Sequence, residues 1–351
     1  MTTAHLISAI KNKLIILRGM KRILILWFLW SIVTINADAV RIGKFECALH
    51  ESTRTATITG ATKDVATAGI LTIPEYVTYE EKNYLVTRIE DNAFWSSKFD
   101  PAIEWINFPP TIEEVGTAAF RDNKELWSMA WPGDATKKIG AYAFAGCSKL
   151  QVFPIPPLVE EMGRNALEGC TCLTGMIFGG NLKEVPYEVC KGCTGIGEIL
   201  IFPGLFNNLK KIQDNAFEGC TSLRLFILCA DLDYFGSDVF KGCTNLTNIS
   251  SQTYAPRRYV EDWSPFEKYH YRVVNLEVPK GTLELYRNTP EWGSFLSITE
   301  IEETAVSATK SFDATRILKQ YSIDGKLLAQ PQRGLNIQKM SDGTTRKVIK
   351  D

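Results

Sequence analysis

Apolar residues recur through the middle of the chain at intervals of 23 to 27 residues. The leading apolar position of each unit is Ile89, Val115, Ile139, Met162, Val185, Ile212 and Phe235. The fifth residue after it repeats in step, as Phe94, Phe120, Phe144, Leu167, Cys190, Phe217 and Phe240. A period in this range over seven units is typical of a solenoid, in which each unit buries its apolar face only by stacking on its neighbours.

A second apolar pattern, L-x-x-φ-x-φ, follows in each unit and often closes with Pro, as at Leu150, Phe153, Ile155 and Pro156. Apolar residues two apart lie on one face of a β-strand. We therefore expect one strand per unit, and stacked units then give a parallel sheet. The residues expected to face the core are Ile106, Phe108, Met129, Trp131, Phe153, Ile155, Met176, Phe178, Phe226 and Leu228.

Residues 40–86 alternate apolar and polar positions, as in Thr55 to Thr59, and are rich in β-branched residues. This pattern predicts short strands. A solenoid needs an end unit that covers the core of its first repeat. We therefore expect a β-rich amino-terminal cap over 40–86, followed by the solenoid and its closing segment over 87–300.

The motif A-F-x-G-C-x-x-L, seen best from Ala216 to Leu223, resembles the BspA-like leucine-rich repeats. Three units depart from it: one has Leu167 and one has Cys190 in place of Phe, and the Val115 unit lacks Gly-Cys. The resemblance implies a leucine-rich-repeat solenoid with one parallel strand per repeat and a short helical or irregular convex side. It also implies a secreted or cell-surface protein that acts in adhesion.

Beyond Gln252 the repeat pattern lapses. Residues 253–272 are rich in aromatic and basic residues, and we expect them either to bind a partner or to pack over the end of the array. The following segment, with Val278-Pro-Lys-Gly281, resembles the closing segment of this family. Its aromatic residues, Tyr286, Trp292 and Phe295, are expected to cover the last repeat.

The amino terminus has the features of a secretory signal peptide over residues 1–39. Lys21 and Arg22 precede a short apolar run, and Ala37-Asp-Ala39 forms an A-x-A cleavage site. The run is short for a membrane span, although an uncleaved anchor is the alternative. We expect cleavage after Ala39, export, and no membrane span in the mature chain.

The carboxy-terminal residues 317–351 differ from the repeats. Asp-Gly pairs at 324–325 and 342–343 stand between apolar runs, which predicts hairpins and a small all-β module after a linker at 301–316. The elements from Tyr321 to Lys326, from Gly334 to Ile337 and at the end of the chain resemble the sorting tail of type IX secretion substrates. That resemblance implies the secretion machinery as a partner; an ordinary hairpin appendage is the alternative.

Charge and composition argue against several functions. Residues 40–304 contain 25 Lys and Arg against 35 Asp and Glu, a balance of −10, which disfavours nucleic acid as a partner. His50 and His270 lie outside the repeats, so a shared catalytic site with a nucleophile is not expected. The Gly-Cys cysteines occupy one repeat position and predict a buried ladder, and we expect no zinc or other cofactor.

We therefore predict an exported, non-enzymatic binding protein. Alternate strand positions face outward, and an ordinary solvated sheet face should be polar. Here several outward positions are apolar, which predicts a docking surface for a host or bacterial protein unless a flanking segment such as residues 253–272 folds over them and buries them. A glycan-binding module for nutrient capture is the alternative. The predicted partner-binding residues are Trp105, Val152, Ile177, Leu200, Leu225 and Ile227.

Overall fold

A computed structural model describes residues 39–96, 102–131, 135–201, 209–228, 232–256, 264–301, 317–322, 327–328, 334–340 and 345–350. The predicted signal segment, apart from its last residue, lies outside these described residues. The same holds for the predicted linker, apart from its first residue, and for both Asp-Gly pairs.

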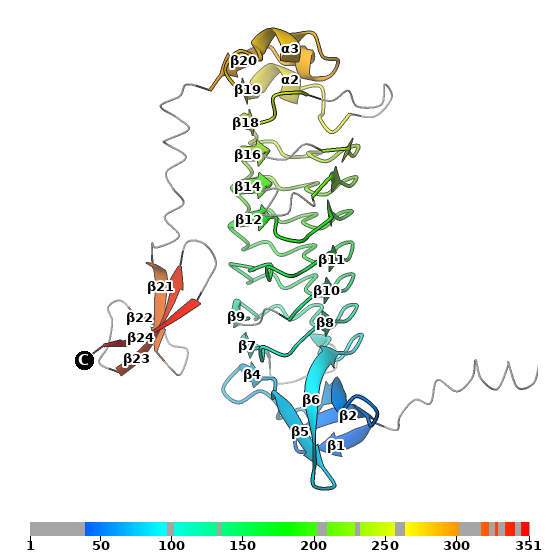
Figure 1. Cartoon of the computed structure of the whole chain (residues 1–351). Coiled ribbons are helices and arrows are strands. Elements are labelled where there is room, and N and C mark those ends of the chain that lie inside the picture. The colour runs from blue at the N-terminus through cyan, green and yellow to red at the C-terminus, as the bar shows by residue number, and fades with distance from the viewer. Residues whose placement is uncertain are drawn as a thin grey trace, which may run out of the picture. The chain divides into compact units, whose positions relative to one another are not determined.

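The middle of the chain is a stack of repeats whose strands form two sets of parallel ladders (Figure 1). The first set follows the L-x-x-φ-x-φ pattern and consists of a three-stranded and a six-stranded sheet. Its strands are β4 (Ile70–Thr72), β7 (Trp105–Asn107), β9 (Ser128–Ala130), β12 (Gly175–Phe178), β14 (Glu198–Ile201), β16 (Leu225–Leu228), β18 (Asn248–Ser251), β19 (Asn275–Val278) and β20 (Ser297–Glu300).

The second set was not predicted and contains two-residue strands at the leading apolar position of each repeat. These are β8 (Glu114–Val115), β10 (Lys138–Ile139), β11 (Glu161–Met162), β13 (Glu184–Val185), β15 (Lys211–Ile212) and β17 (Tyr234–Phe235). They pair in parallel, as in Val115 with Ile139 and Ile212 with Phe235. The solenoid fold is confirmed, and its convex side carries a short strand in addition to turns.

The core lies between the two sets of ladders. All seven leading residues are buried, and so are all seven residues five positions further on. The predicted inward strand residues are also buried, except that Trp131 and Ile155 are half-buried at the edge of the core. The register assigned from the sequence is therefore confirmed.

The longer ladder is interrupted at one repeat. Residues 151–156 form no strand, although Phe153 is buried at its expected position. Pro154 falls in the middle of this segment and Pro156 at its end, and a proline has no N–H to donate to a ladder. The side chains of this repeat thus fill the core while its backbone separates the sheet of β9 from the sheet of β12.

The amino-terminal cap is β-rich, as predicted. Its strands are β1 (Val40–Ile42), β2 (Phe45–His50), β3 (Thr55–Ala61), β5 (Tyr76–Tyr79) and β6 (Lys82–Ile89), together with β4. The hairpin of β5 and β6 is antiparallel, but β6 pairs in parallel with both β3 and β8. The cap therefore continues directly into the solenoid ladders.

Each repeat turns through a left-handed residue three positions after its leading residue. The seven residues there have φ between 51° and 58°, and Asn or Asp fills four of these positions, as at Asn165 and Asn215. A second positive φ, at the glycine of Gly-Cys, lies between 70° and 75°, as at Gly219. Glycine adopts this conformation without a steric penalty, which explains why it precedes the cysteine.

Aromatic side chains stack through the core from repeat to repeat. Phe94, Phe120 and Phe144 stack with ring centroids 5.2 and 5.3 Å apart and nearly parallel planes. The ring stack stops where Leu167 and Cys190 replace Phe, and resumes with Phe217 and Phe240. Leu167 and Cys190 thus interrupt the stack of aromatic rings, but both side chains remain buried in the core.

The stack continues beyond Gln252, where the sequence pattern was expected to lapse. Phe266 is buried and stacks on Phe240 at 5.3 Å with planes 7° apart. The N–H of Phe240 donates to the carbonyl oxygen of Pro265 at 3.1 Å, as the N–H of Phe217 does to Val239 one repeat earlier. Residues 264–266 therefore supply another turn of the core.

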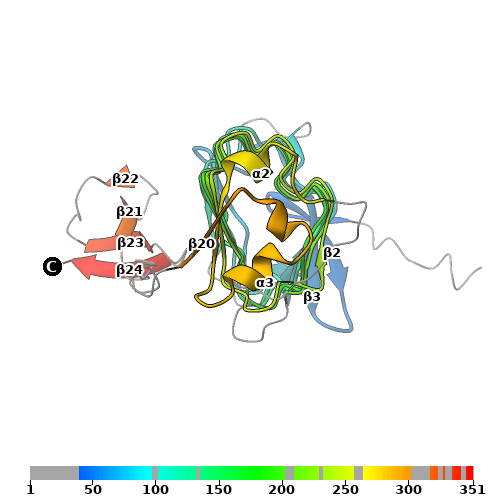
Figure 2. The same cartoon turned by 90° about the horizontal axis from the view of Figure 1, so that it is seen from above.

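The closing segment covers the end of the array. It contains α2 (His270–Val273), α3 (Leu283–Arg287) and the 3-10 helix η2 (Trp292–Ser294) between β18, β19 and β20. Tyr286, Trp292 and Phe295 are buried, as predicted. Figure 2 shows the successive turns overlying one another, with α2 and α3 across the end.

The carboxy-terminal residues form a separate four-stranded antiparallel sheet in the order β22-β21-β23-β24. Its strands are β21 (Ile317–Ser322), β22 (Leu327–Leu328), β23 (Gly334–Met340) and β24 (Thr345–Lys350). The small all-β tail predicted from the sequence is therefore present.

Candidate functional site

Three of the predicted partner-binding residues form one row across the six-stranded sheet. Ile177 in β12 pairs in register with Leu200 in β14, and Leu200 pairs with Ile227 in β16. Ile177 is 42% exposed, and the other two side chains are half-buried on the same outward face. We call Ile177, Leu200 and Ile227 the apolar row.

Polar residues border the apolar row on the same face. Leu225 lies two residues before Ile227, in the neighbouring row, where its register partners are Glu198 and Asn248. Beyond Ile227 the row continues with Ser250 and then Glu277. The apolar surface is therefore a local patch of adjacent strands with a polar rim.

The structure does not bring Val152 and Trp105 into this row. Val152 is half-buried in the segment without a strand, two repeats before β14. Trp105 lies in β7 of the three-stranded sheet, where its register partners are Ile70 and Ser128. The six predicted residues thus belong to at least two different surfaces.

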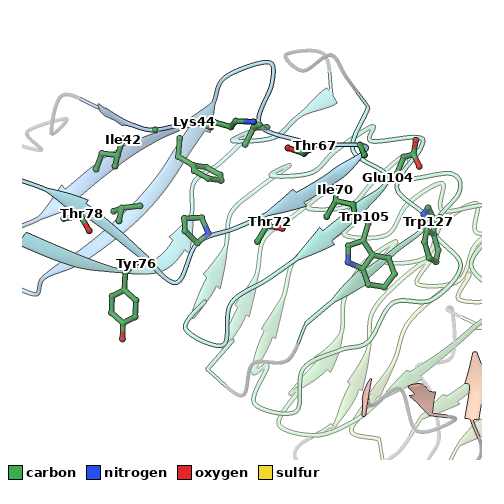
Figure 3. A pocket seen from close by; sticks show the side chains of 16 residues that line it. Ile42, Lys44, Thr67, Ile70, Thr72, Tyr76, Thr78, Glu104, Trp105 and Trp127 are labelled. Carbon is green, nitrogen blue, oxygen red and sulfur yellow. The ribbon is translucent and has the colours of Figure 1, made fainter. Parts of the chain in front are cut away.

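Trp105 lines a groove of about 1060 Å³ between the amino-terminal cap and the outward face of the three-stranded sheet (Figure 3). Ile70 and Thr72 of β4 lie in the middle of this groove, with Tyr76 of the cap hairpin on one side. Trp105 and Trp127 lie on the other side (Figure 3). We call this the cap groove. Its other lining residues include Ile42, Lys44, Phe45, Val77, Thr78 and Glu104.

A hydrogen-bonded chain fixes the wall of the cap groove. The indole Nε1 of Trp105 donates to Oδ1 of Asn107 at 2.8 Å, and Nδ2 of Asn107 donates to Oγ1 of Thr72 at 3.2 Å. The rings of Trp105 and Trp127 lie 4.9 Å apart with planes inclined by 53°. The two indoles thus form an angled aromatic wall, in which the sheet sets the orientation of Trp105.

Sequence reasoning missed most of the cap groove. Trp105 and Trp127 are 22 residues apart, close to the repeat period, and this spacing was a usable signal that the two rings are neighbours. Ile70 and Tyr76 carry no such signal, because the β5–β6 hairpin separates them from the periodic repeats.

The Gly-Cys cysteines lie in the core, and each thiol donates to a main-chain carbonyl of the preceding repeat. The bond lengths are between 3.0 and 3.3 Å, from Cys147 to Phe120, Cys170 to Phe144, Cys193 to Leu167, Cys220 to Cys190 and Cys243 to Phe217. We call this set the thiol ladder. Burial raises the pKa of the Cys243 thiol to about 12 and also raises the pKa of Cys147 and Cys220, so these thiols are poor nucleophiles.

The two histidines after the targeting segment make structural contacts. His50 Nε2 lies 3.0 Å from Oγ1 of Thr57 in the cap. His270 is buried in α2, where its Nε2 lies 3.2 Å from the carbonyl oxygen of Cys243 and its Nδ1 accepts from the N–H of Glu267 at 3.0 Å. His270 thus contacts the backbone of Cys243 and not its thiol.

Glutamates form ion pairs with basic residues of neighbouring repeats along the side that carries the two-residue strands. Glu114 lies between Arg88 and Lys138, at 3.6 and 3.1 Å, and Glu160 pairs with Lys183 at 3.2 Å. Within the residues that the structure describes, no group of three His, Cys, Asp or Glu could hold a metal ion. The described part of the chain also contains no helix long and apolar enough to cross a membrane.

Comparison with one solved structure supports the fold. The chain is similar to a leucine rich cell surface protein from Faecalibacterium prausnitzii, with 21% identity and a TM-score of 0.56, over 74% of this chain and 72% of that chain. It is also similar to a T. pallidum leucine rich repeat protein, with 20% identity and a TM-score of 0.49, over 59% of this chain and 90% of that chain. No curated protein matches the sequence at a significant level.

The repeats themselves match a family. The description of that family is BspA type leucine rich repeat region, and six copies match over residues 75–197 and 198–259, more than half of the 351 residues. The match begins inside the cap, in agreement with the pairing of β6 into the repeat ladder. The chain belongs to the BspA-type leucine-rich repeat family, whose members are typically non-catalytic repeat proteins.

Proposed function

We propose that this protein is an exported, non-enzymatic adhesin that binds a protein on a host or bacterial cell surface. The observation that carries the proposal is the apolar row, in which Ile177, Leu200 and Ile227 stand in register on the outward face of the sheet. An outward sheet face is ordinarily polar, and adjacent exposed apolar side chains mark interaction surfaces.

The border of the apolar row supports a protein as its partner. Glu198 and Asn248 flank Leu225, and beyond Ile227 the buried Ser250 is followed by the half-buried Glu277, so polar residues border an apolar centre. Protein interfaces have this arrangement, with a desolvated centre and hydrogen-bonding groups around it. The patch is built on regular strands, which hold its shape before the partner arrives and so reduce the ordering entropy that binding must offset.

Export supports the same function. The signal-like residues 1–39 and the similarity of residues 317–351 to a type IX sorting tail favour secretion through the outer membrane, with the secretion machinery as a second partner. The Faecalibacterium prausnitzii protein with the same fold is described as a cell surface protein. We expect the mature protein to begin near Val40 and to end before about residue 315.

An intact-mass measurement on protein from the native host tests this export route. A mass that corresponds to cleavage after Ala39 and loss of the tail supports it. Residues 321–351 still attached to the released protein would argue against the sorting-tail interpretation, while leaving the docking surface untouched.

The docking surface is tested by a charge placed in the apolar row. The purified chain is screened on an array of extracellular-matrix and bacterial surface proteins, and the binders are remeasured with the double variant Ile177→Asp, Ile227→Asp. We expect at least a hundredfold loss of affinity with a nearly unchanged melting temperature, because both side chains face outward.

Thr299→Asp is the matched control, since it adds a charge to the same face of the sheet on β20, three strands beyond β16 and outside the polar rim. It should keep wild-type binding. Unimpaired binding by the Ile177, Ile227 double variant, or an equal loss with the Thr299 control, would contradict the proposed surface.

A further inference from the structure

The cap groove carries a set of ligand-binding groups that the apolar row does not use. We propose that it is a second, independent site and that it binds a neutral oligosaccharide. In this site the apolar faces of the sugar rings stack on Trp105 and Trp127, and their hydroxyl groups bond to Glu104 and Thr72. The volume of about 1060 Å³ accommodates a few sugar rings, since it lies at the upper end of the range for small-ligand sites.

Trp105 offers a ligand its ring and not its polar edge. The N–H of Trp105 is already bonded to Asn107, so the indole presents its π face to the groove. The C–H bonds on one side of a pyranose ring form an apolar, slightly positive surface, and the face of an aromatic ring is its negative side. The inclined planes of Trp105 and Trp127, at 53°, suit consecutive sugar rings that are turned relative to one another.

The wall is set in place before a ligand arrives. Asn107 lies in β7 beside Trp105 and is itself bonded to Thr72 of the neighbouring strand. A ring held in this way loses little conformational entropy on binding, which raises affinity for a given contact area. Asn107 is therefore a positioning residue, while Trp105 makes the contact.

Glu104 supplies the hydrogen-bond acceptor. Its side chain lies over Gly69, where an added Cβ would come within 2.9 Å of the Glu104 carboxyl carbon, so the glycine leaves room for it. Glu104 is exposed and forms no ion pair with another described residue. A carboxylate accepts hydrogen bonds from sugar hydroxyls and forms stronger bonds than a neutral acceptor does.

Charge selects a neutral saccharide over an anionic one. The ammonium group of Lys44 donates to the carbonyl oxygen of Asp64 at 2.6 Å and lies 3.5 Å from its carboxylate, so its charge is already compensated. The Glu104 carboxylate and the acidic balance of residues 40–304 repel uronic acids and sulfated sugars.

The groove is less suited to an extended peptide. A peptide strand would have to add to the outer edge of β4, but Ile70 already exchanges hydrogen bonds with Thr67 there, at 3.0 and 3.1 Å. The edge that strand addition needs is therefore occupied by the cap itself.

The test titrates the purified full chain with four neutral hexasaccharides, cellohexaose, laminarihexaose, maltohexaose and xylohexaose, by calorimetry and tryptophan fluorescence. We expect at least one to bind and to change the fluorescence. Trp105→Ala should weaken that binding by at least about tenfold, as loss of an aromatic anchor does. Tyr76→Ala and Glu104→Gln, both at exposed positions, should weaken it by about threefold or more without affecting folding.

Two controls separate this site from the docking surface. The Ile177→Asp, Ile227→Asp variant should bind the hexasaccharide as the wild type does. The two sites are thereby tested independently, and a negative result for one does not contradict the other. A galacturonate hexasaccharide should bind more weakly than the neutral probe, and Glu104→Gln should reduce that difference.

The proposal is overturned if none of the four hexasaccharides binds. It is equally overturned if Trp105→Ala, Tyr76→Ala and Glu104→Gln all retain wild-type affinity. Fluorescence changes with a leucine-rich decapeptide, in the absence of any change with the sugars, would assign the groove to a peptide instead.

Discussion

The side-chain amide of Asn123 donates to the main-chain carbonyl oxygen of Phe94 at 2.7 Å, which is the bond that a cysteine thiol makes in later repeats. Asn123 belongs to the repeat without Gly-Cys, and it also donates to the carbonyl oxygen of Phe120 at 2.9 Å. In place of the glycine this repeat has Asp122, with a φ of 60°. The repeat therefore departs from the motif in sequence and keeps its hydrogen-bonding function.

Replacement of Asn123 tests whether the donor at this position stabilises the solenoid. Asn123→Ala removes the side-chain donor of the buried Phe94 carbonyl and should lower the free energy of unfolding by about 1–3 kcal/mol. Asn123→Cys should lose less, because the thiol can bond as Cys147 does. Urea unfolding of both variants measures the difference. Equal losses in the free energy of unfolding would indicate that Asn123 stabilises the repeat by packing and not by its hydrogen bond.

Truncation in the core should cost far more than truncation on the outward face. Phe226 is fully buried and lies 4.9 Å from Phe240, centroid to centroid. Phe226→Ala should lower the free energy of unfolding by roughly 3–5 kcal/mol through cavity formation. Ile177→Ala, on the outward face of the sheet two repeats away, is the control and should change it by less than about 1 kcal/mol.

Chemical unfolding monitored by circular dichroism checks this pair of variants. A small effect of Phe226→Ala would mean that the core relaxes around the missing ring. A large loss in the free energy of unfolding for Ile177→Ala would mean that the Ile177 side chain is more buried in solution than its position on the outward face implies.

Two glycines with different surroundings make a matched comparison. A Cβ added at Gly163 would lie 2.2 Å from the main-chain nitrogen of Ala141 in the preceding repeat, while at Gly197 the nearest atom is a side-chain nitrogen of Arg224 at 3.6 Å. Gly163→Ala must push two repeats apart, so we expect it to destabilise the protein by several kcal/mol or to prevent folding.

Gly197→Ala should be neutral or stabilising by about 0.4–1 kcal/mol, because it restricts the unfolded chain without a clash. Thermal unfolding of the two variants provides the measurement. Similar melting temperatures for both would show that the repeats separate more easily than their main-chain contact implies.

The sequence predicts the core of this fold because each buried position is repeated. One misread unit is corrected by its neighbours, and so Leu167 and Cys190 could be assigned to the Phe position despite their different side chains. Phe266 has the same kind of signal, since it follows Phe240 by 26 residues. Its repeat was missed because the surrounding residues resemble neither the Gly-Cys motif nor the strand pattern.

The candidate site could be predicted only in part. Period-two alternation identifies Ile177, Leu200 and Ile227 as outward residues, and the register places them in one row. The same alternation does not predict that the sheet is interrupted at Pro154, between Trp105 and Ile177. It also cannot place Tyr76, because the fold of the cap over the sheet depends on tertiary packing and not on the repeat period.

His270 lies at the end of the thiol ladder as a neutral, buried imidazole. Its Nδ1 accepts from the N–H of Glu267, and its Nε2 donates to the carbonyl oxygen of Cys243. Protonation would place a second N–H against the N–H of Glu267. Burial lowers the pKa of His270 below its usual value, an effect larger than the opposing influence of the Cys243 carbonyl and the Glu267 carboxylate.

A lowered pKa in the folded state means that the unfolded chain binds the proton more readily. The stability from neutral His270 is therefore fully present above the unfolded pKa of about 6.5 and is lost as pH falls from there toward the folded pKa. His270→Gln retains one donor and one acceptor but does not titrate. The fall in the free energy of unfolding between pH 7.5 and 5.5, measured by urea unfolding, should be smaller in this variant than in the wild type. Parallel pH profiles for the two proteins would show that His270 does not couple protonation to the stability of the closing segment.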